Sequence, residues 1–568
     1  MLSYRKLAMR VLGRPLHTGG IDSPRPASQR AAAFILTAVM LTTLAAPAFA
    51  GTWSIENGDI TVKAGETGND VTQNNVTTKN DTDTIITNSD KDTASSHTVT
   101  IETNDKNDKV EVTLDNVNIK ADSGSALTSK GDVTLTLKGD NSLTGGNGGS
   151  GISSSGSLTI SGGENNSLTA QGGSGSGIFS SGGVTISGGT VNATGGSSSG
   201  GSDSGDGIHS GSLTISGGTV TATGGSGADG SGGSGIRTFS SGGVTISGGT
   251  VNATGGTGGT GENSNGGSGI YIYSSSGSLT VSGGTVTANG GSGGGNGGDG
   301  ISSTNTTISG GSTVTANGGN GGSLVGGDGI RSGGVVTISG NTVNAAGGYG
   351  GKVGGYGICS FDRVAISGGT VEAAGGNGST GGGSGIYSSV IDLSGSLELT
   401  AKAGSPNGKA LSQRGNELDL NTIKDKLGPG AKVTATDADG KVIDQVSTPR
   451  PVEPEESSSS SDGGSAAPSA PASPLPGLTV TDKDGQRISY TSTQSGNTLT
   501  VCVGRLTASF RISLAALRQL RAEGIETITF QTILCSTTLS LDELLAMGGE
   551  DAEAVLTHRF TDSSLTVG

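Results

Sequence analysis

Residues 177–196 read "GIFSSGGVTISGGTVNATGG", and residues 235–256 read "GIRTFSSGGVTISGGTVNATGG". The second stretch repeats most of the first, but the residue after "GI" changes from Phe to Arg. Val184, Ile186 and Val191 alternate with polar residues, which is the period of a β-strand with one buried face. Gly-Gly pairs between the strand-like segments favour turns. The repeated part therefore predicts the fold, and the variable position is where function is most worth seeking.

The dipeptide "GI" recurs at nearly constant spacing, with Ile at 152, 178, 208, 236, 270, 301, 330, 358 and 386. Degenerate copies around Leu127 and Leu411 extend the series to about eleven units. A self-similar period of this length is typical of a solenoid. Each unit holds three strand-like segments and no helical periodicity. We therefore predict an all-β parallel β-helix of about eleven coils with three short strands in each.

Stacking of the coils would place the apolar positions of successive units in buried ladders. The Ile of each "GI" forms one predicted ladder, and Ile186 and Val191 with their counterparts form two more. Thr185 and the equivalent Thr residues should face solvent. The Gly/Ser-rich segment before each "GI", such as residues 195–207, varies in length. We expect these segments to leave from one corner of the coil as flexible spacers.

The amino-terminal 50 residues have the pattern of a secretory signal peptide. A long basic region precedes an apolar stretch that ends in Ala48-Phe49-Ala50, a small-x-small cleavage pattern. We expect residues 1–50 to be removed and the mature chain, without a membrane span, to be secreted, extracellular or retained at the cell surface. The net charge is −15, which argues against nucleic acid as a partner.

Composition divides the remaining chain into four parts. Residues 51–125 are rich in Thr, Asn and Asp and are predicted to form an amino-terminal cap and the first coils. Residues 126–446 contain the Gly-rich repeats and a carboxyl-terminal cap. Residues 447–477 are rich in Pro and Ser and predict a linker. Residues 478–568 have larger apolar residues and predict a small α+β domain.

The domain at residues 478–568 combines strand-like segments such as "TLTVCVG" and "TITFQTI" with two helical segments. "SLAALRQLRAEG" begins with Ser513, and "SLDELLAMGG" begins with Ser540 in capping-box spacing, so both helices are expected to be capped by serine. Cys502 and Cys535 lie in this domain. A disulfide between them and two buried thiols on neighbouring strands are both open alternatives.

The residue after each "GI" should face outward if the Ile faces inward, and so should the residue two places further on. Aromatic and Arg side chains are concentrated at these positions. Aromatic rings suit the C–H faces of sugars, and the Arg fork suits their polar groups. The alternative is that these side chains pack under the Gly/Ser segments or simply favour strands. The predicted carbohydrate-binding residues are Phe179, Arg237, Phe239, Tyr271, Tyr273, Arg331, Phe361 and Tyr387.

Asp206, Asp299 and Asp328 each directly precede a "GI", and the last two form a second candidate site. Asp299 and Asp328 belong to successive units and would lie one coil apart, beside backbone carbonyls, as oxygen ligands for Ca²⁺. Most other units have Ser at this position, so the chain has no regular calcium repeat. Polysaccharide lyases and hydrolases need clustered acidic and basic groups. Because His97, His209 and His558 are scattered, we expect no catalytic activity.

The repeat phrase "GI-x-S-x-G-x-(V/L)TISGGTV-x-A-x-GG" is accompanied by "VTLDNVNI" at residues 112–119. Together they resemble the Gly-rich β-helix proteins secreted by clostridia-like Firmicutes, which are often described as containing carbohydrate-binding domains. The resemblance covers about residues 95–445. It implies a right-handed parallel β-helix that binds plant or acidic polysaccharide, with calcium in the better-studied branch. Most of the acidic positions of that branch are Ser in this chain.

Two functions from different classes follow. The leading hypothesis is a secreted, non-catalytic protein that binds an extended polysaccharide or cell-surface glycan through the outward aromatic and Arg face. The alternative is a structural or adhesive surface rod that displays residues 478–568 to a protein partner. Glycan binding by residues 51–446 alone would favour the first hypothesis.

Overall fold

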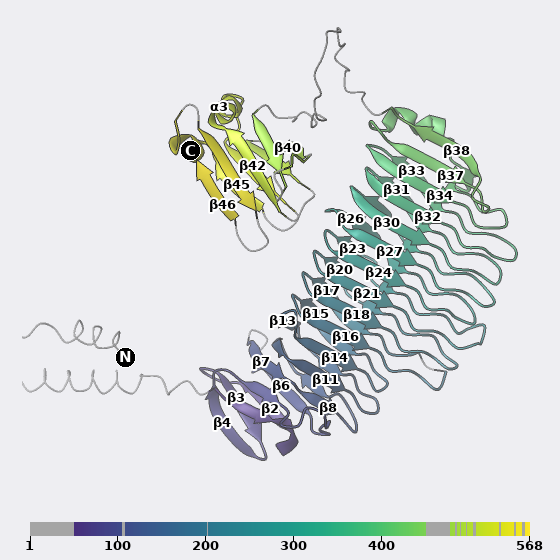
Figure 1. Ribbon diagram of the computed structural model, residues 1–568. Helices are drawn as coiled ribbons and strands as arrows, with labels where there is room; N and C mark the ends of the chain where they lie inside the picture. Colours follow the sequence, from purple (N-terminus) through teal and green to yellow (C-terminus); the bar gives the residue numbers. More distant parts are fainter. Residues whose placement is uncertain are drawn as a thin grey trace, which may run out of the picture. The chain divides into compact units, whose positions relative to one another are not determined.

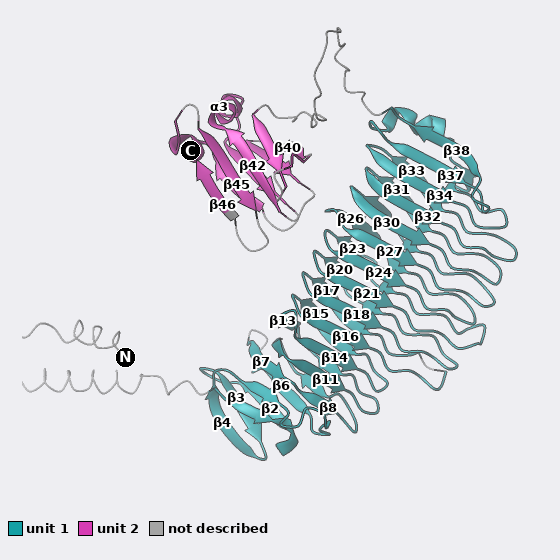
Figure 2. Cartoon of the chain, in the orientation of Figure 1, with its two compact units in different colours: residues 1–454 teal, residues 455–568 magenta. Residues whose placement is uncertain are grey.

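A computed structural model describes residues 50–104, 108–201, 203–449, 477–482, 486–488, 490–495, 497–503, 507–532, 536–549, 552–558 and 563–567. The chain divides into two compact units, residues 1–454 and 455–568 (Figure 2). The predicted signal peptide lies outside the described residues except for Ala50. Cys535 and most of the predicted linker, residues 450–476, also lie outside them.

Unit 1 is a parallel β-solenoid of about 14 turns whose coils stack along one axis (Figure 1). The turns outnumber the roughly eleven repeat units because further coils precede the Leu127 unit, within the predicted first coils of residues 51–125. One such coil contains β7 (Val110–Asp115) and β8 (Asn118–Lys120), which pair in parallel with β10 (Val133–Lys138) and β11 (Asp140–Thr144). The all-β class and the parallel solenoid are thereby confirmed.

One sheet of the solenoid collects the "GI" and "VTI" segments of each coil. In several coils the two segments join into one strand with a register shift, as between Ser180 and Gly183, so three separate strands are not present everywhere. Besides β7 and β10, the sheet contains β1 (Thr52–Ser54), β2 (Ile60–Ala64), β3 (Asn69–Gln73), β4 (Val76–Asp81), β5 (Ile85–Thr87), β6 (Val99–Glu102), β9 (Leu127–Ser129), β12 (Ile152–Ser154), β13 (Leu158–Gly162), β15 (Ile178–Ile186), β17 (Ile208–Ile215), β19 (Ile236–Thr238), β20 (Val244–Ile246), β22 (Ile270–Ile272), β23 (Ser278–Val281), β25 (Ile301–Ser303), β26 (Asn305–Ile308), β28 (Ile330–Ser332), β29 (Val335–Ile338), β31 (Ile358–Ile366), β33 (Ile386–Leu393), β35 (Leu411–Gln413) and β36 (Asn416–Glu417).

A second sheet collects the "TVNAT"-type segments, and its parallel strands keep the same register from coil to coil. Thr190, for example, lies beside Thr219, and Thr219 lies beside Thr250. Besides β8 and β11, this sheet contains β14 (Ser167–Gln171), β16 (Thr190–Thr194), β18 (Thr219–Thr223), β21 (Thr250–Thr254), β24 (Thr285–Asn289), β27 (Thr313–Asn317), β30 (Asn341–Ala346), β32 (Gly369–Ala374), β34 (Leu397–Lys402), β37 (Lys432–Thr436) and β38 (Val442–Ser447).

The core of unit 1 is the set of stacked apolar ladders that the alternation predicts. Ile178, Ile186 and Val191 are fully buried, and their counterparts in the other repeats are buried to the same degree. Each fully buried side chain of this size contributes about 1.5–3 kcal/mol relative to an exposed one. Because the coils stack without interruption, many small units supply one continuous core.

The Gly-rich segments leave from one corner of the coil, as predicted, but they are not loose spacers. Their backbones stack in register along the solenoid (Figure 1). Gly225 N–H donates to the Gly205 oxygen at 2.8 Å, and Gly256 N–H donates to the Gly233 oxygen at 2.7 Å. A Cβ at Gly205 would overlap the backbone of the preceding coil. Glycine is required here because backbones of successive coils touch directly, so the prediction of flexible spacers is wrong.

Antiparallel strands end the parallel stack of unit 1. At the amino-terminal end, β2 pairs with β3 and β3 with β4, next to the short 3-10 helix η1 (Ile55–Asn57). At the carboxyl-terminal end, β35 pairs with β36 and β37 with β38, next to the 3-10 helix η2 (Leu420–Lys426). Such changes of direction protect the ends of a solenoid from pairing with other chains.

The described residues of unit 2 form two four-stranded sheets and two helices, α3 (Leu514–Ala522) and α4 (Leu541–Ala546). The Ser513 side chain accepts the backbone N–H of Ala516 at 3.2 Å, so the predicted cap of α3 is confirmed. Ser540 makes no such bond at α4, and the predicted capping box is wrong. The strands are β39 (Leu478–Thr481), β42 (Ala508–Ser513), β45 (Glu553–His558) and β46 (Ser563–Val567) in one sheet, and β40 (Thr491–Ser495), β41 (Thr498–Cys502), β43 (Thr527–Gln531) and β44 (Ser536–Ser540) in the other.

Candidate functional site

One residue from each coil forms a row on the outer surface of the first sheet. Parallel pairing places the residue after "GI" beside its counterpart in the next coil, so Phe179 neighbours His209 and Arg237 neighbours Tyr271. Stacked strands lie about 4.8 Å apart, which makes the row from Phe179 to Tyr387 about 34 Å long. We call it the outer row, and its members are Thr128, Ser153, Phe179, His209, Arg237, Tyr271, Ser302, Arg331, Cys359, Tyr387 and Ser412.

Most of the predicted positions face outward. Three aromatic residues two places beyond the outer row are well exposed: Phe239 by 38%, Tyr273 by 64% and Phe361 by 53%. Cys359 departs from the prediction, because it is only 1% exposed. Its short side chain lies between those of two larger neighbours in the row. Burial raises the pKa of the Cys359 thiol, which therefore stays protonated at neutral pH.

Aromatic side chains from three successive coils contact one another in the first half of the outer row, and a Tyr pair lies on the next coil. The His209 ring stands edge-on to Phe179, with centroids 5.6 Å apart, and edge-on to Phe239, with centroids 5.2 Å apart. Edge-to-face geometry is favourable for aromatic pairs. The ring centroids of Tyr271 and Tyr273 lie 5.9 Å apart. We call this group the Arg237 cluster, and its members are Phe179, His209, Arg237, Phe239, Tyr271 and Tyr273.

The guanidinium group of Arg237 lies against two of these rings. Its Cζ is 5.5 Å from the Tyr271 centroid and 5.8 Å from the Tyr273 centroid, within the range of cation–π attraction. Its Nη1 is 4.0 Å from Asp206 Oδ2, which is longer than a hydrogen bond. Its Nε–H is buried and has no hydrogen-bond partner among the described residues. The two Tyr rings and the Asp206 carboxylate therefore hold the Arg237 guanidinium group in place.

A buried carboxylate connects the Arg237 cluster to the stacked backbone. Asp206 is 5% exposed, and its Oδ1 accepts the backbone N–H of Ser234 in the next coil at 2.6 Å. Its Oδ2 lies 3.0 Å from His209 Nδ1. Asp206 precedes a "GI" and His209 follows it, but neither was included among the predicted binding residues. The available signal was "DGIH", in which the acid precedes the outward residue by three positions.

The second half of the outer row has its own group, the Arg331 cluster, with members Arg331, Tyr356, Phe361 and Tyr387. Arg331 Cζ lies 5.3 Å from the Phe361 centroid. The rings of Tyr356 and Tyr387 are stacked, with centroids 4.9 Å apart and an interplanar angle of 19°. Tyr356 was not predicted as a site residue. Ser302 separates the two clusters in the row, so the aromatic surface is not continuous.

The two predicted calcium ligands have partners within the protein. Asp299 Oδ1 accepts the backbone N–H of Asp328 at 2.8 Å, and Asp328 Oδ1 accepts that of Tyr356 at 2.7 Å. Arg331 Nη1 donates to Asp328 Oδ2 at 3.1 Å. Burial raises the pKa of both carboxyl groups. The described residues contain no group of three or more His, Cys, Asp or Glu side chains that could hold a metal ion, and calcium binding stays a prediction.

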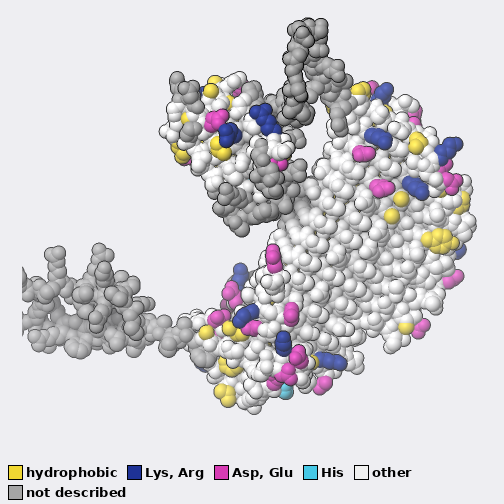
Figure 3. Space-filling model, viewed as in Figure 1, with side chains coloured by type: hydrophobic (Ala, Val, Ile, Leu, Met, Phe, Trp, Pro, Cys, Tyr) yellow, Lys and Arg dark blue, Asp and Glu magenta, His cyan; other side chains and the backbone are white. Residues whose placement is uncertain are grey.

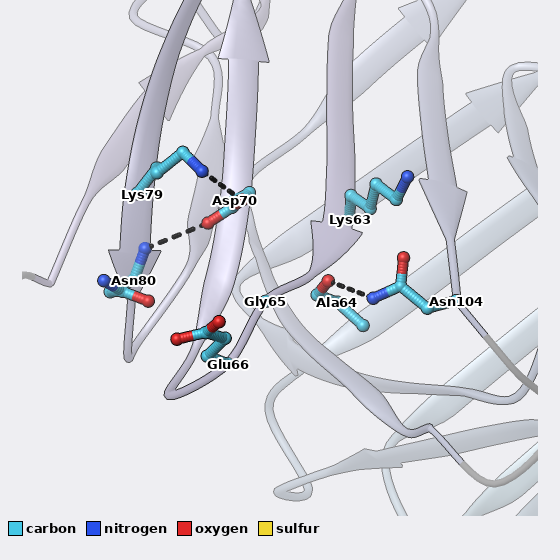
Figure 4. A pocket seen from close by; sticks show the side chains of 8 residues that line it. All are labelled: Lys63, Ala64, Gly65, Glu66, Asp70, Lys79, Asn80 and Asn104. Atoms are coloured by element: carbon cyan, nitrogen blue, oxygen red, sulfur yellow. Dashed lines mark hydrogen bonds and ion pairs between the residues drawn. The ribbon is translucent and has the colours of Figure 1, made fainter.

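A pocket of about 460 Å³ lies at the amino-terminal end of unit 1, away from the outer row (Figure 4). Its lining carries charges of both signs, and two of them form an ion pair. Lys79 Nζ is 3.7 Å from Asp70 Oδ2, and the Asn80 N–H donates to Asp70 Oδ1 at 3.2 Å. These contacts stabilise the hairpin of β3 and β4. The lining residues are Lys63, Ala64, Gly65, Glu66, Asp70, Lys79, Asn80 and Asn104.

The outer face of the second sheet is uncharged in the middle coils. Strands β16, β18, β21, β24 and β27 present only Thr and Asn side chains outward. Figure 3 shows Lys, Arg, Asp and Glu side chains gathered toward the two ends of unit 1 on the visible face. Thr is an ordinary solvent-facing strand residue. On the first sheet, the register also places the predicted Thr residues side by side, as Thr185 beside Thr214.

Comparison of the chain with known protein families, with characterised proteins and with solved structures finds no match in any of the three. Any functional assignment therefore rests on the geometry of the molecule itself. Within the described part of the chain, no helix is long and apolar enough to cross a membrane. The outer row carries two clusters of aromatic and Arg side chains, the groups best suited to bind a ligand, and it is the candidate functional site.

Proposed function

We propose that the chain is a secreted, non-catalytic binding protein whose solenoid holds an extended polysaccharide along the outer row. The observation that carries this proposal is the register that brings Arg237, Tyr271 and Tyr273 together on adjacent coils. A row of about 34 Å offers repeated contacts to a polymer with repeated units. Several weak contacts along one chain can give strong overall binding.

The chemistry of the two clusters suits sugars. Exposed faces of Tyr273 and Phe361 provide apolar area for the C–H groups of a sugar ring. Burial raises the pKa of the Tyr271 hydroxyl, so this group stays protonated and can donate to a sugar oxygen. The side chains project from a stacked sheet with a continuous core, and a rigid sheet lowers the entropy lost when a ligand binds.

The direct test is a polysaccharide array probed with the full chain and with a variant that removes exposed rings. The triple variant Tyr271→Ala, Tyr273→Ala and Tyr387→Ala should lose most of the binding. Tyr349→Ala is the matched control, because Tyr349 is 51% exposed but lies in the loop between β30 and β31, outside the outer row. The control should bind like the unmodified chain.

Three results would contradict all or part of the proposal. If the triple variant binds as well as Tyr349→Ala does, the outer row is not the binding surface. If the array is silent and a protein partner binds residues 478–568 instead, the rival function, a surface rod that displays unit 2, is favoured. Release of sugar fragments from any bound polysaccharide would contradict the non-catalytic part of the proposal.

A further inference from the structure

Both Arg residues of the outer row are compensated by buried carboxylates. Arg237 Nη1 lies 4.0 Å from Oδ2 of Asp206, which is 5% exposed. Arg331 donates to Asp328, which is 3% exposed, at 3.1 Å. Asp299 adds a further carboxyl group next to Asp328. The neighbouring carboxyl groups therefore offset part of the positive charge that these guanidinium groups present.

The net charge of the whole chain also disfavours binding of polyanions. Its formal net charge is −15, so the long-range field repels polyanions. A guanidinium that already lies beside a carboxylate gains little from a second one, because the first anion offsets the attraction. The N–H groups of the same guanidinium can still donate hydrogen bonds to neutral oxygen atoms. The Arg237 and Arg331 side chains are 35% and 45% exposed, so part of each stays open to a ligand.

We propose that the outer row selects uncharged polysaccharides and discriminates against acidic ones, an inference that rests on the carbohydrate binding proposed above. The rings pack on the C–H faces of the sugars, and the Arg237 and Arg331 guanidinium groups donate to hydroxyl and ring oxygen atoms. Asp206 and Asp328 act as positioning residues that hold these cations beside the rings. This specificity is opposite to the acidic-glycan binding that the sequence resemblance implies.

The experiment compares polymers that differ mainly in charge, by affinity gel electrophoresis of the full chain at low and high ionic strength. Suitable pairs are methyl-esterified and de-esterified polygalacturonate, hydroxyethyl and carboxymethyl cellulose, and carboxyl-reduced and native hyaluronan. We expect an uncharged member to retard the chain and its acidic counterpart to bind about fivefold to tenfold more weakly. Stronger retardation by the acidic member, lost at high ionic strength, overturns the inference but supports sugar binding. No retardation by any polymer contradicts the proposed function itself.

A charge variant tests the role of the buried carboxylates. In Asp206→Asn the amide oxygen can still accept the Ser234 N–H, but Arg237 loses its compensating anion. We expect binding of the acidic member to rise about fivefold at low ionic strength, while binding of the uncharged member changes little. Asp229→Asn makes the same change of charge at an exposed position outside the row and should leave the discrimination unchanged. Equal behaviour of the two variants, with unchanged thermal stability, overturns the inference.

Discussion

Replacing Gly256 with alanine should destabilise unit 1, although glycine-to-alanine changes at compatible positions usually stabilise proteins. Gly256 lies in the stacked Gly-rich segment between β21 and β22. Its N–H donates to the Gly233 oxygen at 2.7 Å, and its oxygen accepts the Gly267 N–H at 2.9 Å. A methyl group there would lie 2.6 Å from the Gly225 carbonyl carbon and closer still to its oxygen. Side chains do not make contacts this short.

The loss of stability in Gly256→Ala can be estimated from the backbone that the new methyl group must displace. The obstacle is backbone that is itself bonded on both sides, so it cannot rotate away as a flexible side chain would. An added methyl in tight packing costs about 1–3 kcal/mol, and the displacement weakens two hydrogen bonds worth about 1 kcal/mol each. The smaller entropy of the unfolded alanine chain offsets about 0.4–1 kcal/mol. We expect a net loss of about 2–4 kcal/mol.

Thermal and urea denaturation of the full chain would measure this change, with Gly200→Ala as the matched control. Gly200 also lies in a Gly-rich segment, but a methyl group there would meet no described atom within 4 Å. Its substitution should raise stability by about 0.4–1 kcal/mol. The two variants therefore have opposite predicted signs. Equal shifts of the unfolding midpoint would refute direct backbone contact as the reason for glycine.

Three further predictions concern a buried acid, the core and a helix cap. Burial first, and then the charge of Asp299, raises the pKa of Asp328 from 3.8 to about 7, so ionised Asp328 destabilises the folded state and stability falls as pH rises through that interval. Chemical denaturation should show Asp328→Asn gaining stability relative to the unmodified chain as the pH rises from about 4 to about 7, and a difference independent of pH would contradict this. Ile270→Ala removes a fully buried ladder residue and should cost about 2–5 kcal/mol of unfolding free energy, measured by urea denaturation. Ser513→Ala removes the side-chain cap of α3 and should lower the stability of unit 2 by about 1 kcal/mol, detectable as a lower melting temperature of that unit alone.

The amino-acid sequence by itself determined the coil and the direction in which each strand residue points. Alternation within one repeat is a local property, so Ile178, Ile186 and Val191 could be assigned to the core, where all three are buried. The repeat length then placed Phe179 beside His209 across the coil boundary. For the same reason the outer row could be located before any contact within it was known.

Only the tertiary structure decided what happens between coils. The ordering of the Gly-rich segments depends on how closely the backbones of different coils approach, and composition suggested flexible spacers instead. Asp206 accepts the backbone N–H of Ser234 in the next coil, and its other oxygen lies beside His209. An acid directly before "GI", the position considered for calcium, thus holds an outward side chain of the outer row in place. Cys359 is buried because its neighbours in the row are larger. Alternation specifies which way a side chain points, whereas its contacts depend on the distance and size of residues that lie about 28 positions away along the chain.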